Sequence, residues 1–162
     1  MKLTLYTLLA LCLLGSFAAC KKDADAEVYD RALYFGPDTI AIRAYVNANK
    51  IPATKMSNGI FYQIIAPGTG SFNYTSVSKI TVDFEGKLLN GAVFDTTTGK
   101  TSYTSALGAL VQGWQIGIPL IQKGGKIRLI MPSFYGYQNS TAYPSIPPNS
   151  PLDFTISLID VQ

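Results

Sequence analysis

The sequence predicts an α+β domain in which an antiparallel sheet packs around one short helix, with a helical extension ahead of it. Several segments alternate apolar and polar residues with the period of two that a half-buried strand requires. Beyond residue 58, only the segment that begins at Trp114 has the apolar spacing of a helix. Apolar residues make up 48% and charged residues 14% of the 162 residues, so the chain can build a packed core.

The composition excludes several classes of function. The chain contains no histidine, so catalysis by a Ser–His or Cys–His pair is excluded, as is a zinc site built on histidine. The formal net charge is only +3, and no cluster of basic residues extends beyond Lys21 and Lys22. A nucleic-acid partner is therefore not expected.

The first residues are predicted to be a secretory signal. Lys2 precedes an apolar run from 3 to 17, which is too short to span a membrane and ends in the small residues Ala18 and Ala19 before Cys20. This arrangement resembles the lipobox of bacterial lipoproteins, so we expect a signal peptide over 1–19 and lipidation of Cys20. Cys12 would leave with the signal, and no internal disulfide is expected. The alternative is a plain secreted protein with an incidental cysteine.

Residues 20–37 are polar and lack any period, so they are predicted to be a tether. Their opening, rich in Lys and Asp, resembles the surface-export signals of Bacteroidetes lipoproteins. An acylated Cys20 carrying more than one chain would anchor the protein stably. We therefore expect a lipid-anchored protein of the outer membrane in the cell envelope, and both its surface face and its periplasmic face remain open.

A short helix and a linker are predicted over 38–58. Asp38 can cap a helix that runs to about Lys50. Ile40, Ala44 and Tyr45 fall on one face of that helix, which we expect to be its packed face.

Four later segments are predicted to be strands, over 58–70, 78–89, 125–132 and 152–161. The first ends in a Pro-Gly turn, and the third is a compact apolar run. Alternation is clearest in the second and fourth, whose apolar faces contain Ile80, Val82, Phe84, Leu152, Phe154, Ile156 and Leu158.

The second helix is predicted from Trp114 to about Lys123. Trp114, Ile118 and Ile121 recur on one stripe that should face the sheet. Pro119 removes a backbone hydrogen bond, so the helix should be short or bent there. Trp114 is the only tryptophan and lies in an uncharged segment. From the residues alone it is either ordinary core or the floor of an apolar binding site.

Five motifs in order resemble FKBP-type peptidyl-prolyl isomerases. They are GTG at 68–70, VDFEGKLLNGAVFDTT at 82–97, LGALVQGWQIGIPLIQKGGK at 107–126, IMPSFYGY at 130–137 and IPPNSPLDFTISLIDV at 146–161. The resemblance covers 59–162 and implies that family's fold, a curved antiparallel sheet or half-barrel wrapped around one short helix. The helix ahead of it resembles the extension of lipoprotein members.

The resemblance also implies a hydrophobic cup that binds X–Pro bonds and needs neither metal nor cofactor. Trp114 would form its floor, with Phe94 and Phe154 as walls. The Tyr137 hydroxyl and the Val111 backbone N–H would donate to a substrate carbonyl. The implied catalytic residues are Asp95, Val111 and Tyr137, and the implied substrate-binding residues are Phe84, Phe94, Tyr103, Leu110, Trp114, Ile146 and Phe154.

The chain departs from the family pattern near Asp95. Phe84 stands where the family commonly has a tyrosine that joins the aspartate in a polar network. The usual arginine partner of Asp95 is missing, and Lys100 follows a shortened loop as a non-planar substitute. Gln138 replaces a common glycine, and the polar loop over 138–145 should influence substrate preference.

Simpler interpretations stand beside these roles. Asp95 is also a natural strand-end turn residue, Tyr137 could lie at a sheet edge, and the phenylalanines would be core in any β domain. Three functions therefore remain open. The first is a peptidyl-prolyl isomerase that acts on proline-containing, unfolded or exported polypeptides and binds the macrolides that inhibit this family. The second is a chaperone or adaptor that holds proline segments with little turnover, and the third is a lipid-anchored scaffold.

Overall fold

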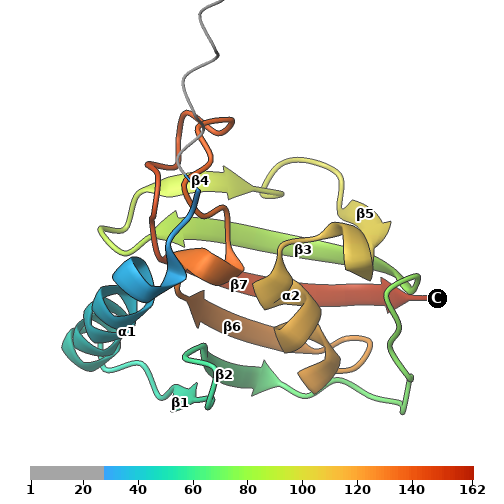
Figure 1. Ribbon diagram of the computed structural model, residues 1–162. Coiled ribbons are helices and arrows are strands. Elements are labelled where there is room, and N and C mark those ends of the chain that lie inside the picture. The colour runs from blue at the N-terminus through green and yellow to red at the C-terminus, as the bar shows by residue number, and fades with distance from the viewer. Residues whose placement is uncertain (1–27) are drawn as a thin grey trace, which may run out of the picture.

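The computed structural model describes residues 28–162. Its sheet has seven antiparallel strands, six of them in the order β1-β2-β6-β7-β3-β4 and the seventh, β5, paired with β3. The strands are β1 (Thr54–Lys55), β2 (Phe61–Ala66), β3 (Lys79–Leu88), β4 (Val93–Thr96), β5 (Tyr103–Ala106), β6 (Lys126–Met131) and β7 (Leu152–Val161). The predicted fold class is confirmed, because this sheet surrounds one short helix, α2 (Gln112–Gly117), which lies across β3, β7 and β6 in Figure 1.

Each strand predicted from the sequence is present, and the apolar faces predicted for β3 and β7 are their core faces. Leu152, Ile156 and Leu158 of β7 are fully buried, as are Ile80 and Val82 of β3. The short strands β1, β4 and β5 were not predicted individually. They occupy sheet edges, where β4 and β5 pair with successive parts of β3.

The second helix is shorter than predicted, for the reason that the sequence suggests. It ends at Gly117, and the chain continues as a 3-10 turn, η2 (Ile118–Leu120), that contains Pro119. The stripe of Trp114, Ile118 and Ile121 is buried against the sheet, as predicted.

Two glycines allow α2 to lie directly on β6. A Cβ atom at Gly113 would collide with the sulfur of Met131, and one at Gly117 would collide with the methyl groups of Leu129. The helix could not approach the strand as closely with larger residues at these positions.

The N-terminal helix corrects the prediction for residues 31–50. Helix α1 (Arg31–Ala48) begins seven residues before the expected cap, with Asp30 as its N-cap. The Asp30 carboxylate accepts hydrogen bonds from the N–H groups of Ala32 at 2.8 Å and Leu33 at 3.4 Å. Asp38 is therefore not a cap, and residues 31–37 of the predicted tether are helical even though Pro37 lies within this helix. The rest of the predicted tether up to residue 27, the predicted signal and Cys20 lie outside the described residues.

The packed face of α1 differs in part from the prediction, since Ile40 and Ala44 are exposed whereas Tyr45 packs against a core cluster. Ile42 and Val46 are the buried apolar residues, whereas Ile40 is 71% exposed. Ile42 and Val46 pack with Ile51, Phe61 of β2 and Ile130 of β6 in a second, smaller core. Ile130 alternates with the residues of β6 that face α2, so α1 covers the opposite face of that strand.

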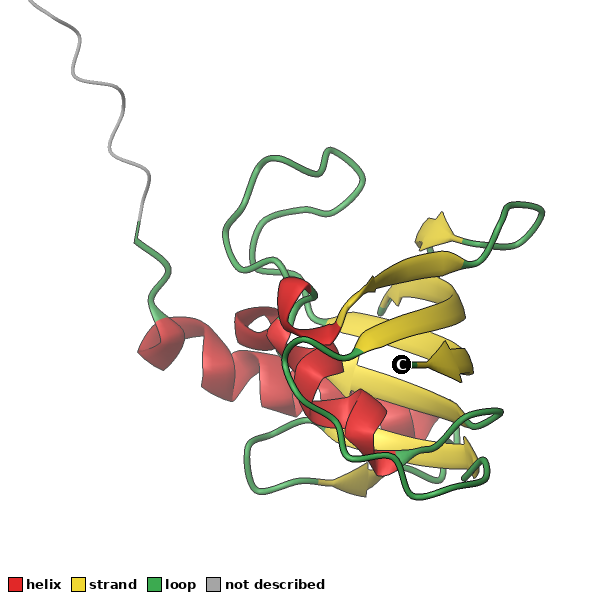
Figure 2. Ribbon diagram, turned by 90° about the vertical axis from the view of Figure 1, so that its right-hand side faces the viewer, coloured by secondary structure: helices red, strands yellow, loops and turns green. Residues whose placement is uncertain are grey.

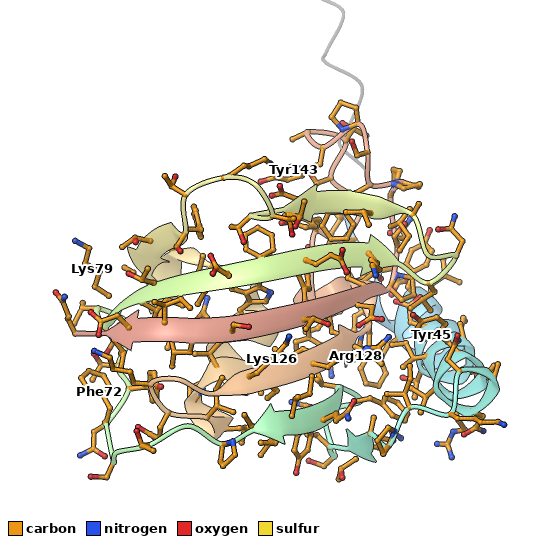
Figure 3. The ribbon with its side chains drawn as sticks, turned by 180° about the vertical axis from the view of Figure 1, so that it is seen from behind. Tyr45, Phe72, Lys79, Lys126, Arg128 and Tyr143 are labelled. Carbon is orange, nitrogen blue, oxygen red and sulfur yellow. The ribbon has the colours of Figure 1, made fainter. Side chains whose placement is uncertain are left out.

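A buried ion pair lies under α1. Asp153 of β7 is 3% exposed although it alternates with the core residues, because α1 covers it. Its carboxylate lies 2.6 Å from the Arg128 guanidinium and accepts a 2.8 Å hydrogen bond from the Tyr45 hydroxyl. Figure 3 shows Tyr45 of α1 beside Arg128 on the rear of the sheet. Within residues 28–162, neither α1 nor any other helix has the length and apolarity needed to cross a bilayer.

Candidate active site

An apolar cavity of about 240 Å³ lies between α2 and the edge of the sheet formed by β3, β4 and β5. Its lining contains Phe84, Asp95, Tyr103, Leu110, Val111, Trp114, Tyr137, Tyr143 and Phe154. Eight of the ten residues proposed from the sequence are therefore together in one cavity. The other two, Phe94 and Ile146, line a neighbouring cavity of about 190 Å³ that shares Asp95, Tyr137 and Tyr143 with the first.

Aromatic rings form the floor and walls of the cavity. The ring centroids of Trp114 and Phe154 lie 5.2 Å apart, with an angle of 88° between the ring planes. The centroids of Trp114 and Phe84 are also 5.2 Å apart, with an interplanar angle of 78°. The ring centroids of Phe94 and Phe154 lie 5.4 Å apart, with an interplanar angle of 87°. These edge-to-face contacts join α2, β3, β4 and β7, so the rings are held by the secondary structure. Trp114 is 4% exposed, so it belongs both to the core and to the cavity lining.

The floor also carries an unpaired hydrogen-bond donor. The indole nitrogen of Trp114 is buried and has no hydrogen-bond partner among the described residues. Buried donors are nearly always paired in proteins, so this N–H is an exception.

Gly86 makes room for the aromatic wall, and the sequence analysis missed it. A Cβ atom at this position in β3 would lie 2.6 Å from the Phe94 ring and 2.8 Å from the Phe154 ring. A glycine inside an alternating strand pattern is the signal that could have revealed it, because such glycines often mark close approach of another group.

The Val111 backbone supplies a donor at the start of α2. Val111 is the N-cap of this helix, and its carbonyl accepts from Trp114 N–H at 2.9 Å. Its own N–H donates to no acceptor within residues 28–162. The first N–H groups of a helix have no partner inside the helix, so this one is free to donate to a ligand. The side chain of Gln115 fixes the approach to the helix by donating to the Leu110 carbonyl at 2.7 Å.

Tyr137 presents a neutral phenol to the cavity. Burial raises the pKa of Tyr137 to about 12, and the nearby Tyr143 and Asp95 add to this shift. The phenol therefore keeps its proton at physiological pH. Tyr137 lies in the turn after η3 (Ser133–Tyr135), where Gln138 adopts a left-handed backbone conformation with φ of 55°.

Asp95 is held by local contacts. Its carboxylate accepts from the Thr96 N–H at 2.8 Å and lies 3.6 Å from the ammonium group of Lys100. Lys100 thus occupies the position of a substitute partner, as the sequence suggested. Both side chains are more than half exposed, so the ion pair contributes little to stability. Phe84 offers this carboxylate no hydroxyl.

Tyr143 is the second residue that sequence reasoning missed. Its ring lies 4.4 Å from the Tyr137 ring, and it lines both cavities although its side chain is 47% exposed. It belongs to the long loop between η3 and β7, which projects at the top of Figure 1 and is drawn green in Figure 2. An aromatic residue in an otherwise polar loop was the available signal.

A larger and more open depression of about 500 Å³ adjoins the aromatic cavity and shares Phe84 with it. Its lining is mostly polar, and Lys126, which belongs to it, points from the rear face in Figure 3. It lacks an apolar floor, so we place the candidate active site in the smaller aromatic cavity.

Comparison with known proteins agrees with this geometry. The family model described as FKBP-type peptidyl-prolyl cis-trans isomerase matches residues 72–159. FkpA of Buchnera aphidicola subsp. Schizaphis graminum, a protein of that description, is 41% identical over 111 residues, which are 67% of this chain and 43% of the relative. FkpA of Escherichia coli K12 is 36% identical over 107 residues, which are 65% of this chain and 39% of the relative. The chain thus spans less than half the length of these curated relatives.

Solved structures show the same fold. The crystal structure of Escherichia coli FkpA superposes with a TM-score of 0.68 at 28% identity, over 82% of this chain and 62% of that one. A peptidyl-prolyl cis-trans isomerase from Pseudomonas syringae pv. tomato gives a TM-score of 0.65 at 29% identity, over 78% of this chain and 95% of that one. From its sequence, its sheet and its aromatic cavity, the chain belongs to the family of FKBP-type peptidyl-prolyl cis-trans isomerases.

Proposed function

We propose that this protein is a peptidyl-prolyl cis-trans isomerase that assists the folding of exported proteins. The observation that carries the proposal is the aromatic cavity itself. Its floor is apolar, and the N–H of Val111 and the hydroxyl of Tyr137 remain available to a substrate carbonyl. Proline-containing segments of unfolded polypeptides are the proposed substrates.

Such a cavity can act without a nucleophile. Rotation about an X–Pro bond passes a barrier of roughly 18–20 kcal/mol that amide resonance sets, and uncatalysed it takes roughly tens to hundreds of seconds. The twisted amide has lost resonance, so its oxygen carries less negative charge and needs less solvation than that of the planar amide. An apolar cavity therefore disfavours the planar ground state more than the twisted transition state.

The donors fix one side of the rotating bond. With the prolyl ring on the Trp114 indole, the Tyr137 hydroxyl holds a substrate carbonyl while the remainder of the amide turns. The Val111 N–H holds a second carbonyl from the helix side. Lowering the barrier by about 5–7 kcal/mol would accelerate the rotation by roughly four to five decades.

Exchange NMR on a short X–Pro peptide tests the proposal, with protein from residue 21 to residue 162 and its Asp95→Ala and Tyr137→Phe variants. We expect faster cis–trans exchange that falls in both variants. Unchanged exchange in the presence of well-folded protein would refute isomerase function.

A second candidate is a module that holds proline segments with little turnover. Phe84 favours it, because the Asp95 carboxylate lacks a phenol partner and is left with the exposed Lys100. Peptide resonances that broaden without faster exchange would support this second function.

We also propose that Cys20 is lipidated and anchors the protein to the outer membrane. The apolar run and small residues before Cys20 support this assignment. Metabolic labelling with an alkynyl fatty acid should label the parent and a Cys12→Ser control but not Cys20→Ser. Equal labelling of the parent and Cys20→Ser would contradict it.

A further inference from the structure

A buried carboxylate of helix α1 contacts η3, the turn that precedes Tyr137. Asp38 is 6% exposed, and the residue that it contacts, Ser133 of η3, is fully buried. One carboxylate oxygen of Asp38 accepts from the Ser133 N–H at 2.8 Å and from the Ser133 hydroxyl at 2.5 Å. Figure 1 shows the first turns of α1 (blue) beside η3 (orange).

This carboxylate is costly to bury, so attachment of α1 alone does not account for it. Asp38 forms no ion pair with a basic side chain of the described residues, although buried charges are normally paired. Burial raises the pKa of its carboxyl group, while the two bonds from Ser133 favour the charged form. Apolar residues such as Ile42 and Val46 already attach α1 to the sheet without this cost.

Ser133 joins α1 to the turn that carries Tyr137. Its N–H and hydroxyl face Asp38, whereas its carbonyl accepts from the N–H groups of Gly136 and Gln138, each at 3.0 Å. These two amides flank Tyr137 directly. The single proton of the Ser133 hydroxyl is directed at the Asp38 carboxylate, so the Tyr29 hydroxyl, 2.9 Å from the Ser133 hydroxyl oxygen, donates to that hydroxyl oxygen.

Tyr29 and Arg31 also pack against Phe134 of η3. The Arg31 guanidinium lies 4.5 Å from the Phe134 ring centroid, and the Tyr29 ring lies 6.0 Å from the same ring. Tyr29 and Arg31 at the start of α1 therefore contact Phe134 of η3, while Asp38 binds the buried Ser133 of the same turn.

We propose that Asp38 is a positioning residue for Tyr137 and acts through Ser133. The carboxylate fixes the backbone of η3, and the Ser133 carbonyl then fixes the turn that aims the Tyr137 hydroxyl at the cavity. The inference rests on the proposed function, since it concerns the donor that isomerisation would use. It makes the N-terminal helix part of the active site's support.

A double-mutant cycle tests the proposal by activity. In otherwise unchanged protein from residue 21 to residue 162, we expect Asp38→Ala to lower kcat/KM roughly three- to tenfold. In a Tyr137→Phe background the same change should have less than about a twofold effect, because the positioned hydroxyl is gone. Equal losses in both backgrounds would show that Asp38 acts on folding alone and would overturn the proposal.

Two further variants separate positioning from simple attachment of α1. Tyr45→Phe removes the hydrogen bonds of another α1 side chain, which donates to Asp153 at 2.8 Å and accepts from Arg128 at 3.2 Å, and neither partner belongs to η3. It should leave kcat/KM unchanged, and a loss equal to that of Asp38→Ala would contradict the proposal. Asp38→Asn retains an oxygen that can accept from Ser133, so it should recover most of the activity and remain informative if the alanine variant does not fold.

A spectroscopic measurement keeps the inference separate from the proposed function. In protein labelled with 3-fluorotyrosine, the ¹⁹F resonance of Tyr137 is assigned by its absence from Tyr137→Phe. Asp38→Ala should shift or broaden this resonance, and Tyr45→Phe should not. If the parent shows no isomerase activity, the proposed function fails while this resonance still decides the positioning role. A Tyr137 resonance unmoved by Asp38→Ala would overturn the positioning role whatever the activity.

Discussion

The rings of Trp114 and Phe154 meet edge to face, with centroids 5.2 Å apart and planes at 88°. One ring comes from α2 and the other from β7, the strand between β3 and β6. This contact fixes the cavity floor to the sheet, so changes to the lining are expected to alter binding without moving the floor.

The fluorescence of Trp114 should report occupancy of the cavity. A macrolide of the kind that inhibits this family would cover the indole, and we expect a saturable change in emission intensity. Because Trp114 is the only tryptophan, the signal is unambiguous. No change at saturating macrolide would mean that the cavity is closed to such ligands.

Phe84→Tyr should raise turnover a few-fold. The added hydroxyl would offer Asp95, which lines the same cavity, the phenol partner that it lacks. One such hydrogen bond is worth about 0.5–1.5 kcal/mol, which limits the gain to about tenfold. The gain should disappear in an Asp95→Ala background, and an unchanged rate in the Asp95-containing protein would show that this account of the departure is wrong.

Tyr143→Ala should open the two neighbouring cavities to each other. We expect KM to rise roughly three- to tenfold with a smaller change in kcat, because the lost ring contacts substrate and transition state alike. Discrimination among peptides with different residues beside proline should decrease. Thr141→Ser, a change at an exposed residue of the same loop that lines neither cavity, serves as the control, and an equal effect there would refute a specific role for the Tyr143 ring.

Tyr137 should ionise only at strongly alkaline pH. Its pKa rises from the usual 10.0 to about 12 because the phenol is buried. The raised pKa contributes stability that is complete below pH 10 and is lost as the pH rises towards about 12. The difference between ultraviolet titrations of the parent and Tyr137→Phe should isolate this late ionisation. A difference curve centred near pH 10 would instead indicate an exposed phenol.

Substitutions at two glycines should have opposite effects on stability. Gly86→Ala places a Cβ atom against Phe94 and Phe154, and overpacking of this kind costs about 1–3 kcal/mol. Gly36→Ala meets nothing within 4 Å beyond its chain neighbours and lies inside α1, so it gains helix propensity, but Pro37 crowds a Cβ atom on the residue before it and should limit the gain to less than about 0.5 kcal/mol. Urea denaturation of the two variants measures both free energies of unfolding, and equal effects would contradict the role of Gly86 in shaping the cavity.

The features that the sequence predicted correctly are those that local periodicity controls. The alternation of 152–161 identified the core face of β7, and the stripe of Trp114, Ile118 and Ile121 identified the face of α2. The strand and helix periods place such residues on one face before any tertiary contact exists. Most of the cavity lining followed from the resemblance to FKBP-type isomerases, because the motifs occur here in the same order and each lies on an element that the family fold positions.

Contacts distant in sequence decided the rest. From local signals Asp38 was a plausible helix cap, yet its partner Ser133 lies 95 residues away and α1 begins at Arg31 instead. The Tyr143 ring contacts the Tyr137 ring only because the loop folds back over the cavity, and Gly86 is required only because Phe94 and Phe154 approach it. The sequence by itself determined the four longer strands, the short helix and the apolar character of the site. The start of α1, the buried Asp38–Ser133 contact and the boundary between the two cavities depend on which distant surfaces meet, and only the tertiary structure decides that.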